Sequence, residues 1–221
     1  MTTGWFLVWV GVLVSPGGVD AQVQVAAETR FRELCATCHG AEGHGNQALL
    51  APNLAGLPSW YVEEQLLRFR NGWRGTGDGD HSGATMRAVA LTLADEEISG
   101  LAKHVASLPV YVPEAEAPEE FAQMHELYRE SCASCHRFNG QGEVVFSAAP
   151  LSTFPSWYLA DALRKYRDGV RGSHPKDPKG QQMQEIVEPY SDETIFDLAR
   201  YIGMLGEAYP PGKRRAVGFG R

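Results

Sequence analysis

The chain has 221 residues, of which 43% are hydrophobic and 21% are charged, and this composition suits one large or two small globular domains. The net charge is −7, but residues 210–221 hold four basic side chains and no acid, so residues 22–209 alone carry −10 once Asp20 is also set aside. Such an acidic body disfavours nucleic acid as a partner, because binding nucleic acid needs basic surface. It favours protein partners that dock through a basic patch.

An apolar run of ten residues, WFLVWVGVLV, occupies positions 5–14. Crossing a bilayer takes ~20 apolar residues, so the run fits the core of a secretory signal peptide instead. Val19-Asp20-Ala21 resembles a cleavage site, and we expect residues 1–21 to be a signal peptide that directs the chain to the periplasm. An uncleaved membrane anchor is the alternative, because residues 1–4 lack the basic residue usual in a signal peptide.

A first helix is predicted over roughly residues 25–38, and it leads into a Cys-x-x-Cys-His motif at Cys35, Cys38 and His39. Two thiols three positions apart share one face of a helical turn, and the histidine follows directly. This spacing is typical of covalent haem attachment, with the imidazole beneath the iron. Disulfides, a redox dithiol or half of a zinc site are the alternatives for cysteines in such pairs.

The rest of this half continues with a loop rich in glycine and proline. A second helix is expected from Ser59, as a serine N-cap after proline, to Gly72, as a glycine just past the end. An irregular segment then carries Met86. A last helix begins near residues 92–95 and stops at Pro109. No strand is predicted, so the half is a small all-α domain.

The same pattern returns at an offset of 97 residues without a gap, with Cys132, Cys135 and His136 repeating the motif and Met183 repeating Met86. The matching helices are expected at 122–135, from Ser156 to Gly169, and from Ser191 onward. The chain is therefore a duplication. We expect an N-terminal domain over 22–108, a linker over 109–120, a C-terminal domain over 121–207 and a basic, disordered tail over 208–221.

Two motifs predict two haem c groups, and each iron needs a second axial ligand. Met86 and Met183 each lie 51 residues after the first cysteine of their half, and a thioether suits haem iron. Met124 and Met204 have no counterpart across the repeat and are expected to fill the core. The unpaired histidines are expected to be exposed or to support a ligand, with His81 and His174 as rivals of the methionines; they are His44, His81, His104, His125 and His174.

The surroundings of the haems are also repeated. Each half carries a basic cluster that would either bind haem propionates or form a solvated face, namely Arg68, Arg70 and Arg74, and Lys165, Arg167 and Arg171. The second ring nitrogen of an axial histidine needs an acceptor. We expect the carbonyl of Pro52 in the first half. In the second half the role moves to the carbonyl of Ala149, because the proline there comes one place later, at Pro150.

These residues resemble the cytochrome c4 family of di-haem cytochromes over about residues 28–206. The likeness also includes the Pro52-Asn-Leu-Ala-Gly56 loop and the Arg-x-Gly turns at 70–72 and 167–169. The resemblance implies two tandem class-I cytochrome c domains, all-α and related by a pseudo-twofold axis, whose haems approach through their propionate edges. It further implies a periplasmic carrier between a respiratory donor and a terminal oxidase or reductase.

The predicted function is single-electron transfer rather than enzymatic catalysis, because histidine and methionine together leave no open position on the iron. Partners are expected to be redox proteins with basic docking patches, and any membrane association would come through such a partner. The first alternative is the cytochrome subunit of a dehydrogenase complex, such as a flavocytochrome sulfide dehydrogenase or an alcohol dehydrogenase. The second is a di-haem peroxidase or a thiosulfate-oxidising cytochrome, which would need an open or unusual ligand at one haem.

Overall fold

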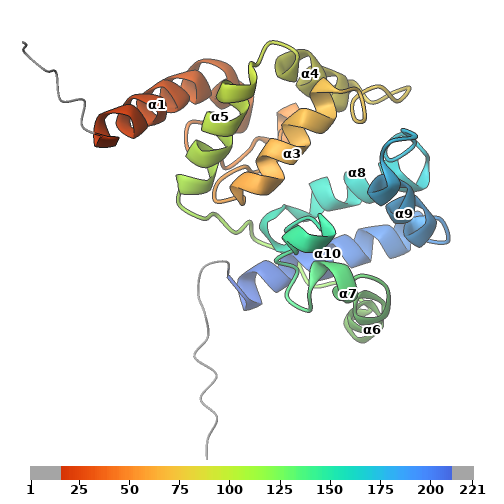
Figure 1. Ribbon diagram of the computed structural model, residues 1–221. Helices are drawn as coiled ribbons and strands as arrows, with labels where there is room; N and C mark the ends of the chain where they lie inside the picture. The colour runs from red at the N-terminus through yellow and green to blue at the C-terminus, as the bar shows by residue number, and fades with distance from the viewer. Residues whose placement is uncertain (1–15, 211–221) are drawn as a thin grey trace, which may run out of the picture.

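Two helical halves, one above the other in Figure 1, make up the computed structural model, which describes residues 16–210. The first half contains α1 (Pro16–Arg30), the π-helical η1 (Phe31–Cys35), α2 (Ala36–His39), η2 (Gln47–Leu49), α3 (Ser59–Arg70), α4 (His81–Ala90) and α5 (Asp95–Ser107). The second contains α6 (Phe121–Ser131), α7 (Ala133–His136), η3 (Val144–Phe146), η4 (Leu151–Thr153), α8 (Ser156–Arg167), α9 (Pro178–Val187) and α10 (Asp192–Ala208).

The all-α prediction is confirmed. Over residues 16–210 the only extended pairing consists of isolated bridges, Asn46 with Ala51 and Glu143 with Ala148. Of the helices in this part of the chain, none has the length and apolarity needed to cross a bilayer. The predicted signal sequence up to residue 15 and the tail from residue 211 lie outside the described residues, so they remain predictions.

The first helix begins earlier than predicted. It runs from Pro16 through a π-helical turn at η1 and on into α2, and so it reaches His39 in one continuous path. Its most deeply buried side chain is Phe31, which is 1% exposed and packs in the core. In the second half, α6 and α7 are separated at Cys132. Both halves therefore deliver the Cys-x-x-Cys-His motif on a short final helical segment.

The predicted serine caps of α3 and α8 are wrong. Ser59 and Ser156 are the first helical residues, and the proline before each occupies the cap position without a side-chain hydrogen bond. The predicted ends are confirmed. Gly72 and Gly169 follow the helices with φ of +72°, a conformation that glycine adopts without strain, and the Gly72 amide donates to the Phe69 carbonyl at 3.1 Å.

The segments that carry the two methionines are helices, not irregular as predicted. Asp80 caps α4 by accepting a hydrogen bond from the Gly83 amide at 3.0 Å, and Asp177 caps α9 through the Gly180 amide at 2.8 Å. An aspartate at this position satisfies an amide that has no partner inside the helix. Each helix is only ten residues long, so its period is weak in the sequence.

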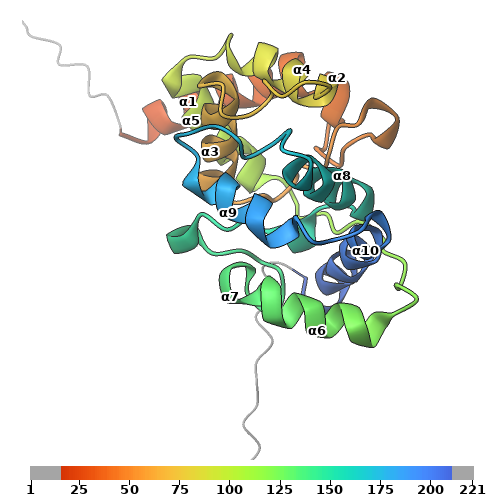
Figure 2. The ribbon, with the colours of Figure 1, turned by 90° about the vertical axis from the view of Figure 1, so that its right-hand side faces the viewer.

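Reciprocal contacts join the two halves. Arg68 of the first half pairs with Asp177 at 2.5 Å, and its repeat equivalent Lys165 pairs with Asp80 at 2.9 Å. When residue i of one half contacts j of the other and the equivalents of i and j also meet, the halves are related by a twofold axis. The view in Figure 2, turned by 90°, keeps the first half above the second. The two equivalent ion pairs therefore indicate that a pseudo-twofold axis relates the halves.

The connector between the halves, residues 109–118, is free of helix and packs on both sides. The buried Asn53 side chain donates to the carbonyl of Tyr111 in the connector at 3.2 Å and to the carbonyl of Thr153 in the second half at 2.8 Å. Tyr111 also stacks on His44 with ring centroids 4.2 Å apart. These contacts hold the connector against the first half. Asn53 also joins the first half to the second through its hydrogen bond to the Thr153 carbonyl.

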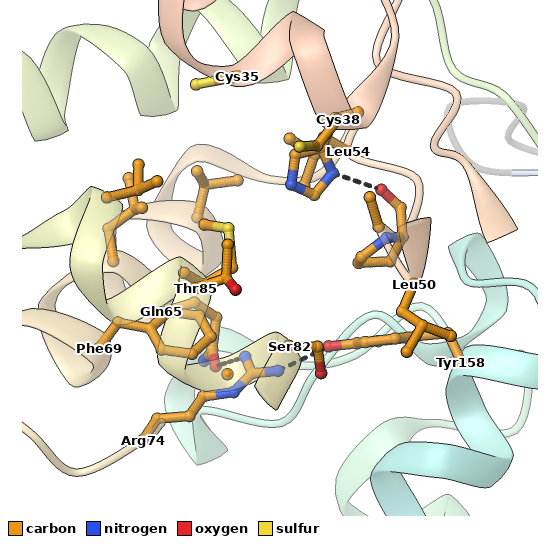
Figure 3. Close-up of a pocket in the computed structure, with 18 of the residues that line it drawn as sticks. Cys35, Cys38, Leu50, Leu54, Gln65, Phe69, Arg74, Ser82, Thr85 and Tyr158 are labelled. Atoms are coloured by element: carbon orange, nitrogen blue, oxygen red, sulfur yellow. Dashed lines mark hydrogen bonds between the residues drawn. The ribbon is translucent and has the colours of Figure 1, made fainter. Parts of the chain in front are cut away.

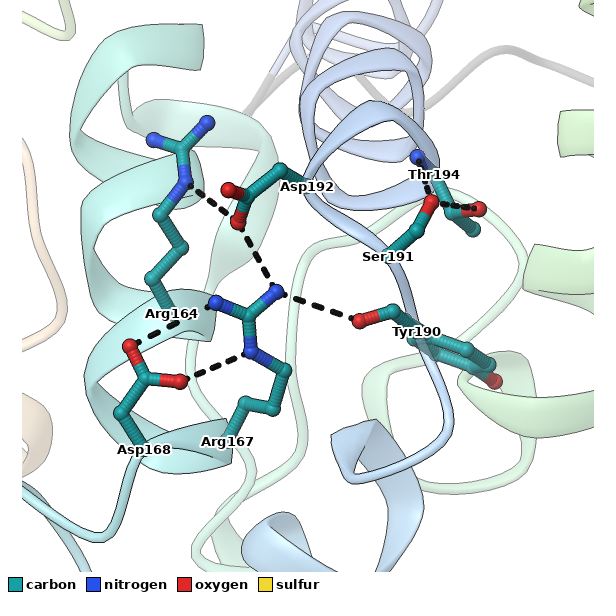
Figure 4. A network of polar contacts seen from close by, with 7 residues as sticks. All are labelled: Arg164, Arg167, Asp168, Tyr190, Ser191, Asp192 and Thr194. Atoms are coloured by element: carbon teal, nitrogen blue, oxygen red, sulfur yellow. Dashed lines mark hydrogen bonds and ion pairs between the residues drawn. The ribbon is translucent and has the colours of Figure 1, made fainter.

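One member of each predicted basic cluster holds its own half together. In Figure 4, Arg167 at the end of α8 donates to Asp192 at 2.8 Å and to the carbonyl of Tyr190 at 3.2 Å. Its equivalent, Arg70, pairs with Asp95 at 2.5 Å. These arginines therefore join the end of α3 or α8 to the start of α5 or α10.

Asp80→Asn is expected to lower stability in a pH-dependent way. Burial raises the pKa of Asp80, but the hydrogen bond and charge of Lys165 outweigh it, and the pKa lies below its ordinary value of 3.8. A lowered folded-state pKa contributes stability that is present above the unfolded pKa and is lost as pH falls through the folded one. Denaturant unfolding should separate the variant from wild type above pH 4, with the gap closing at lower pH. A gap that is constant down to pH 2 would contradict this.

Candidate haem sites

A cavity of about 190 Å³ lies in the first half and brings together the four predicted haem residues, which are Cys35, Cys38, His39 and Met86. Figure 3 shows Cys35 and Cys38 along one side of it, with Phe69, Arg74 and Tyr158 on the other. Most of the remaining lining is apolar and comes from α3, α4, α5 and the loop before α3. A flat, largely apolar group with one polar edge fits such a space.

The second half repeats the arrangement. A cavity of about 170 Å³ is lined by Cys132, Cys135, His136 and Met183, together with apolar residues of α8, α9 and α10. The repeat therefore produces two sites of the same composition. It also means that the helix placement corrected above, α4 and α9, brings each methionine to the cavity of its own half.

Both motif histidines are held in one orientation. The Nδ1 of His39 donates to the carbonyl of Pro52 at 2.8 Å, and the Nδ1 of His136 donates to the carbonyl of Ala149 at 2.9 Å. Both predicted acceptors are confirmed. Because a carbonyl only accepts, the proton lies on Nδ1 and Nε2 keeps its lone pair. Burial lowers the pKa of both histidines despite these hydrogen bonds, so both rings are neutral and able to bind a metal.

The cysteines fit thioether formation better than the alternatives. All four are free, and burial raises the pKa of Cys35 to about 11 and that of Cys132 to about 12. Redox-active dithiols of this motif have a lowered thiol pKa. No group of three or more His, Cys, Asp or Glu side chains converges as a metal site within residues 16–210, which also disfavours a zinc site. The residues present therefore fit haem c in both halves.

The rival ligands lie elsewhere. None of the five remaining histidines lines either cavity. His81 is exposed at the start of α4, and His174 stacks on Trp73 with centroids 5.6 Å apart. Met124 is buried in the core, which agrees with its predicted role, and neither it nor Met204 reaches a cavity.

Each cavity also borrows residues from the opposite half, which the sequence did not reveal. Tyr158, Lys165 and Arg171 line the first cavity, while Tyr61 and Arg68 line the second. In addition, Arg74 donates to the Tyr158 hydroxyl at 2.8 Å. The sequence predicts the basic clusters but not their contacts across the halves. The available signal was that these basic and aromatic residues recur at the offset of 97.

Gly45→Ala is expected to disturb the His39 acceptor. Gly45 has φ of +86°, and an added Cβ would lie 2.7 Å from the Ala51 oxygen and the Asn53 nitrogen, on either side of Pro52. We expect a loss of about 2 kcal/mol or more in the free energy of unfolding and weaker His39 ligation in haem spectra. Gly79→Ala is the matched control, with φ of +77° and open space around its Cβ. Equal losses in the two variants would contradict the argument.

Two helical halves, each with a covalent-attachment motif, an oriented histidine and a methionine around one cavity, define a di-haem c-type cytochrome that carries electrons. The family model for cytochrome c matches residues 25–109 and again 122–206. The chain belongs to the cytochrome c family, and it carries two haem c groups.

Individual relatives agree with this. The chain is 31% identical to the thiosulfate dehydrogenase electron acceptor of Stutzerimonas stutzeri, over 78% of this chain and 79% of that protein. It is 27% identical to cytochrome c4 of Pseudomonas aeruginosa, over 84% of this chain and 90% of the relative. The crystal structure of reduced recombinant cytochrome c4 from Pseudomonas stutzeri superposes with a TM-score of 0.65 at 23% identity, over 81% of this chain and 97% of that one. The resemblance to cytochrome c4 is thereby confirmed.

Proposed function

We propose that this cytochrome is an exported carrier that moves single electrons between redox proteins, with one haem in each half. Cys35 and Cys38 hold the first haem covalently, and His39 and Met86 are the axial ligands of its iron. The second haem is held by Cys132 and Cys135, with His136 and Met183 as axial ligands. The observation that carries this assignment is that each cavity is lined by all four residues of its own half.

Each haem supplies an iron that takes up or releases one electron without a change of ligands. The chain's own residues set the conditions for this. The carbonyls of Pro52 and Ala149 hold the histidine rings and raise their basicity as ligands. The apolar lining excludes water, and a dry, low-polarity site raises the potential because it disfavours the more highly charged oxidised state.

The domain limits follow from the repeat: residues 22–108 and 121–207 are the two haem domains, and residues 109–120 join them. Residues 1–21 direct export to the periplasm and are removed, and residues 208–221 form a basic tail. The apolar run at 5–14 supports export. The acidic body over 22–209 favours partners with a basic patch, and contact with a membrane comes through such partners.

A redox titration of the purified holoprotein, followed by absorption spectra, tests the carrier function. We expect two one-electron transitions and low-spin spectra in both oxidation states, because both irons have two protein ligands. A high-spin ferric band at neutral pH together with turnover of peroxide would overturn the proposal in favour of an enzyme with an open haem.

The likeness to a thiosulfate dehydrogenase electron acceptor favours a specific donor. In this second candidate function, the cytochrome takes electrons from a dehydrogenase that oxidises a sulfur compound. Mixing the oxidised holoprotein with thiosulfate dehydrogenase and thiosulfate should reduce both haems, and the rate should fall with added salt as expected for docking between opposite charges. Reduction no faster than with thiosulfate alone would exclude this donor.

A further inference from the structure

The reciprocal ion pairs between the halves end on the helices that carry the methionines. Asp80 is the cap of α4, which carries Met86, and Asp177 is the cap of α9, which carries Met183. Their cationic partners, Lys165 and Arg68, lie on α8 and α3 of the opposite half. Each methionine helix is therefore anchored at its N-terminus by a side chain from the other half.

These anchors are well buried. The side chains of both aspartates are 4% exposed, and those of Arg68 and Lys165 are 13% and 21% exposed. Lys165 also donates to the Ser82 hydroxyl at 2.9 Å, so it contacts both the cap and the first turn of α4. Removing one partner from a pair this buried leaves a poorly solvated charge and costs much more than breaking a surface pair.

The first turn of each methionine helix packs closely against its capping aspartate. A Cβ on Gly83 would lie 1.9 Å from the Asp80 carboxylate, and one on Gly180 would lie 2.3 Å from that of Asp177. Each cap and its first turn are thus packed against each other, as the hydrogen bonds from the two glycine amides also show. A force that holds the cap consequently holds the start of the helix.

We propose that each half positions the methionine ligand of the other half, through the pairs Lys165 with Asp80 and Arg68 with Asp177. This inference rests on the proposed function, in which Met86 and Met183 bind iron. Detachment of a methionine requires its helix to open locally, and the free energy of that opening includes the contacts that the helix makes at its ends. The ion pair from the other half is one of these contacts, so losing it makes detachment more frequent.

The test is made on the full holoprotein with Lys165→Gln and Arg68→Gln. The readouts are the rate at which added imidazole replaces methionine in the oxidised protein, and the methionine methyl NMR signals of the reduced protein. Met86→Ala and Met183→Ala assign each signal to its haem. We expect Lys165→Gln to raise the rate at which imidazole replaces methionine roughly tenfold at the Met86 haem alone, although residue 165 belongs to the second half. Arg68→Gln should act at the Met183 haem alone.

Three further variants separate positioning from other effects. Lys165→Arg keeps the positive charge, as Arg68 does at the equivalent position, so its imidazole rate should match that of the wild type. Asp80→Asn keeps a good cap but removes the ion pair, so it should raise the imidazole rate at the Met86 haem as Lys165→Gln does. A direct effect of charge on the iron would instead shift the potential in opposite directions in these two variants. Asp95→Asn, which breaks an ion pair within one half, is the matched control and should leave both rates unchanged.

The outcomes are distinct. Rates that rise at the haem of the substituted half, rise equally at both haems or stay at the wild-type value would overturn the inference. If Lys165→Gln does not fold, Asp80→Asn makes the same measurement. Absence of methionine methyl signals in the wild-type protein would instead refute the ligand assignment, so failure of the proposed function is recognised separately.

Discussion

Replacing Cys35 and Cys38 together by alanine is expected to leave a protein with one covalent haem and an unfolded or poorly packed first half. The proposed haem site in this half is a cavity of about 190 Å³. An enclosed apolar cavity costs roughly 24 cal/mol per Å³, so leaving this partly open one unfilled costs at most about 5 kcal/mol. That is comparable to the whole stability of a small domain, and a half of this size has little core to spare.

Intact mass and thermal unfolding measure the effect of the cysteine substitutions. The mass should fall by one haem, and the unfolding of the first half should shift far more than that of the second. The paired substitution of Cys132 and Cys135 is the matched variant, and it should act on the second half, whose cavity is about 170 Å³. If either double variant kept two covalent haems, the attachment sites would be wrong.

Met86→Ala is expected to convert one haem, and only one, to a high-spin or misligated form. Met86 is the only methionine that lines the first cavity, and none of the histidines outside the two motifs lines it. Alanine is too short to reach the iron. The loss of a methionine ligand should also lower the potential of that haem, because a thioether favours the reduced iron.

Absorption and NMR spectra of the holoprotein give the answer for Met86→Ala. Met183→Ala should produce the same change at the other haem, and the double variant should lack both methionine signals. Met124→Ala is the control, because Met124 is buried in the core and lines no cavity. It should reduce stability while leaving both haem spectra intact. An unchanged spectrum in either ligand variant would remove that methionine from the assignment.

Much of the fold and of the haem sites could be predicted, because each site is defined by a short sequence motif and that motif occurs twice. The motif Cys-x-x-Cys-His needs only adjacent residues, and the offset of 97 pairs each methionine with its counterpart. Even the acceptor for each histidine ring followed from the position of a proline in the loop, at Pro52 in one half and Pro150 in the other. The all-α architecture, the two haems and the carrier function were therefore within reach of the sequence.

The features that the sequence did not predict have physical causes. The sequence predicts irregular segments at α4 and α9 because each helix is only ten residues long and starts at an aspartate cap, Asp80 or Asp177, rather than with a clear apolar period. The serines at 59 and 156 were taken for caps, whereas proline already fixes the entry to each helix. The contacts between halves were missed because comparing a repeat with itself says nothing about how its two copies meet.

The assignment of this protein as a di-haem carrier depends most on two haems being joined to the polypeptide through thioether bonds. The intact mass of the holoprotein, unfolded in acid and extracted with organic solvent, tests this directly. The structure predicts a polypeptide heavier by two haems, with the colour remaining in the aqueous protein phase. A mass gain of fewer than two haems, or a red colour that passes into the solvent, would contradict the account.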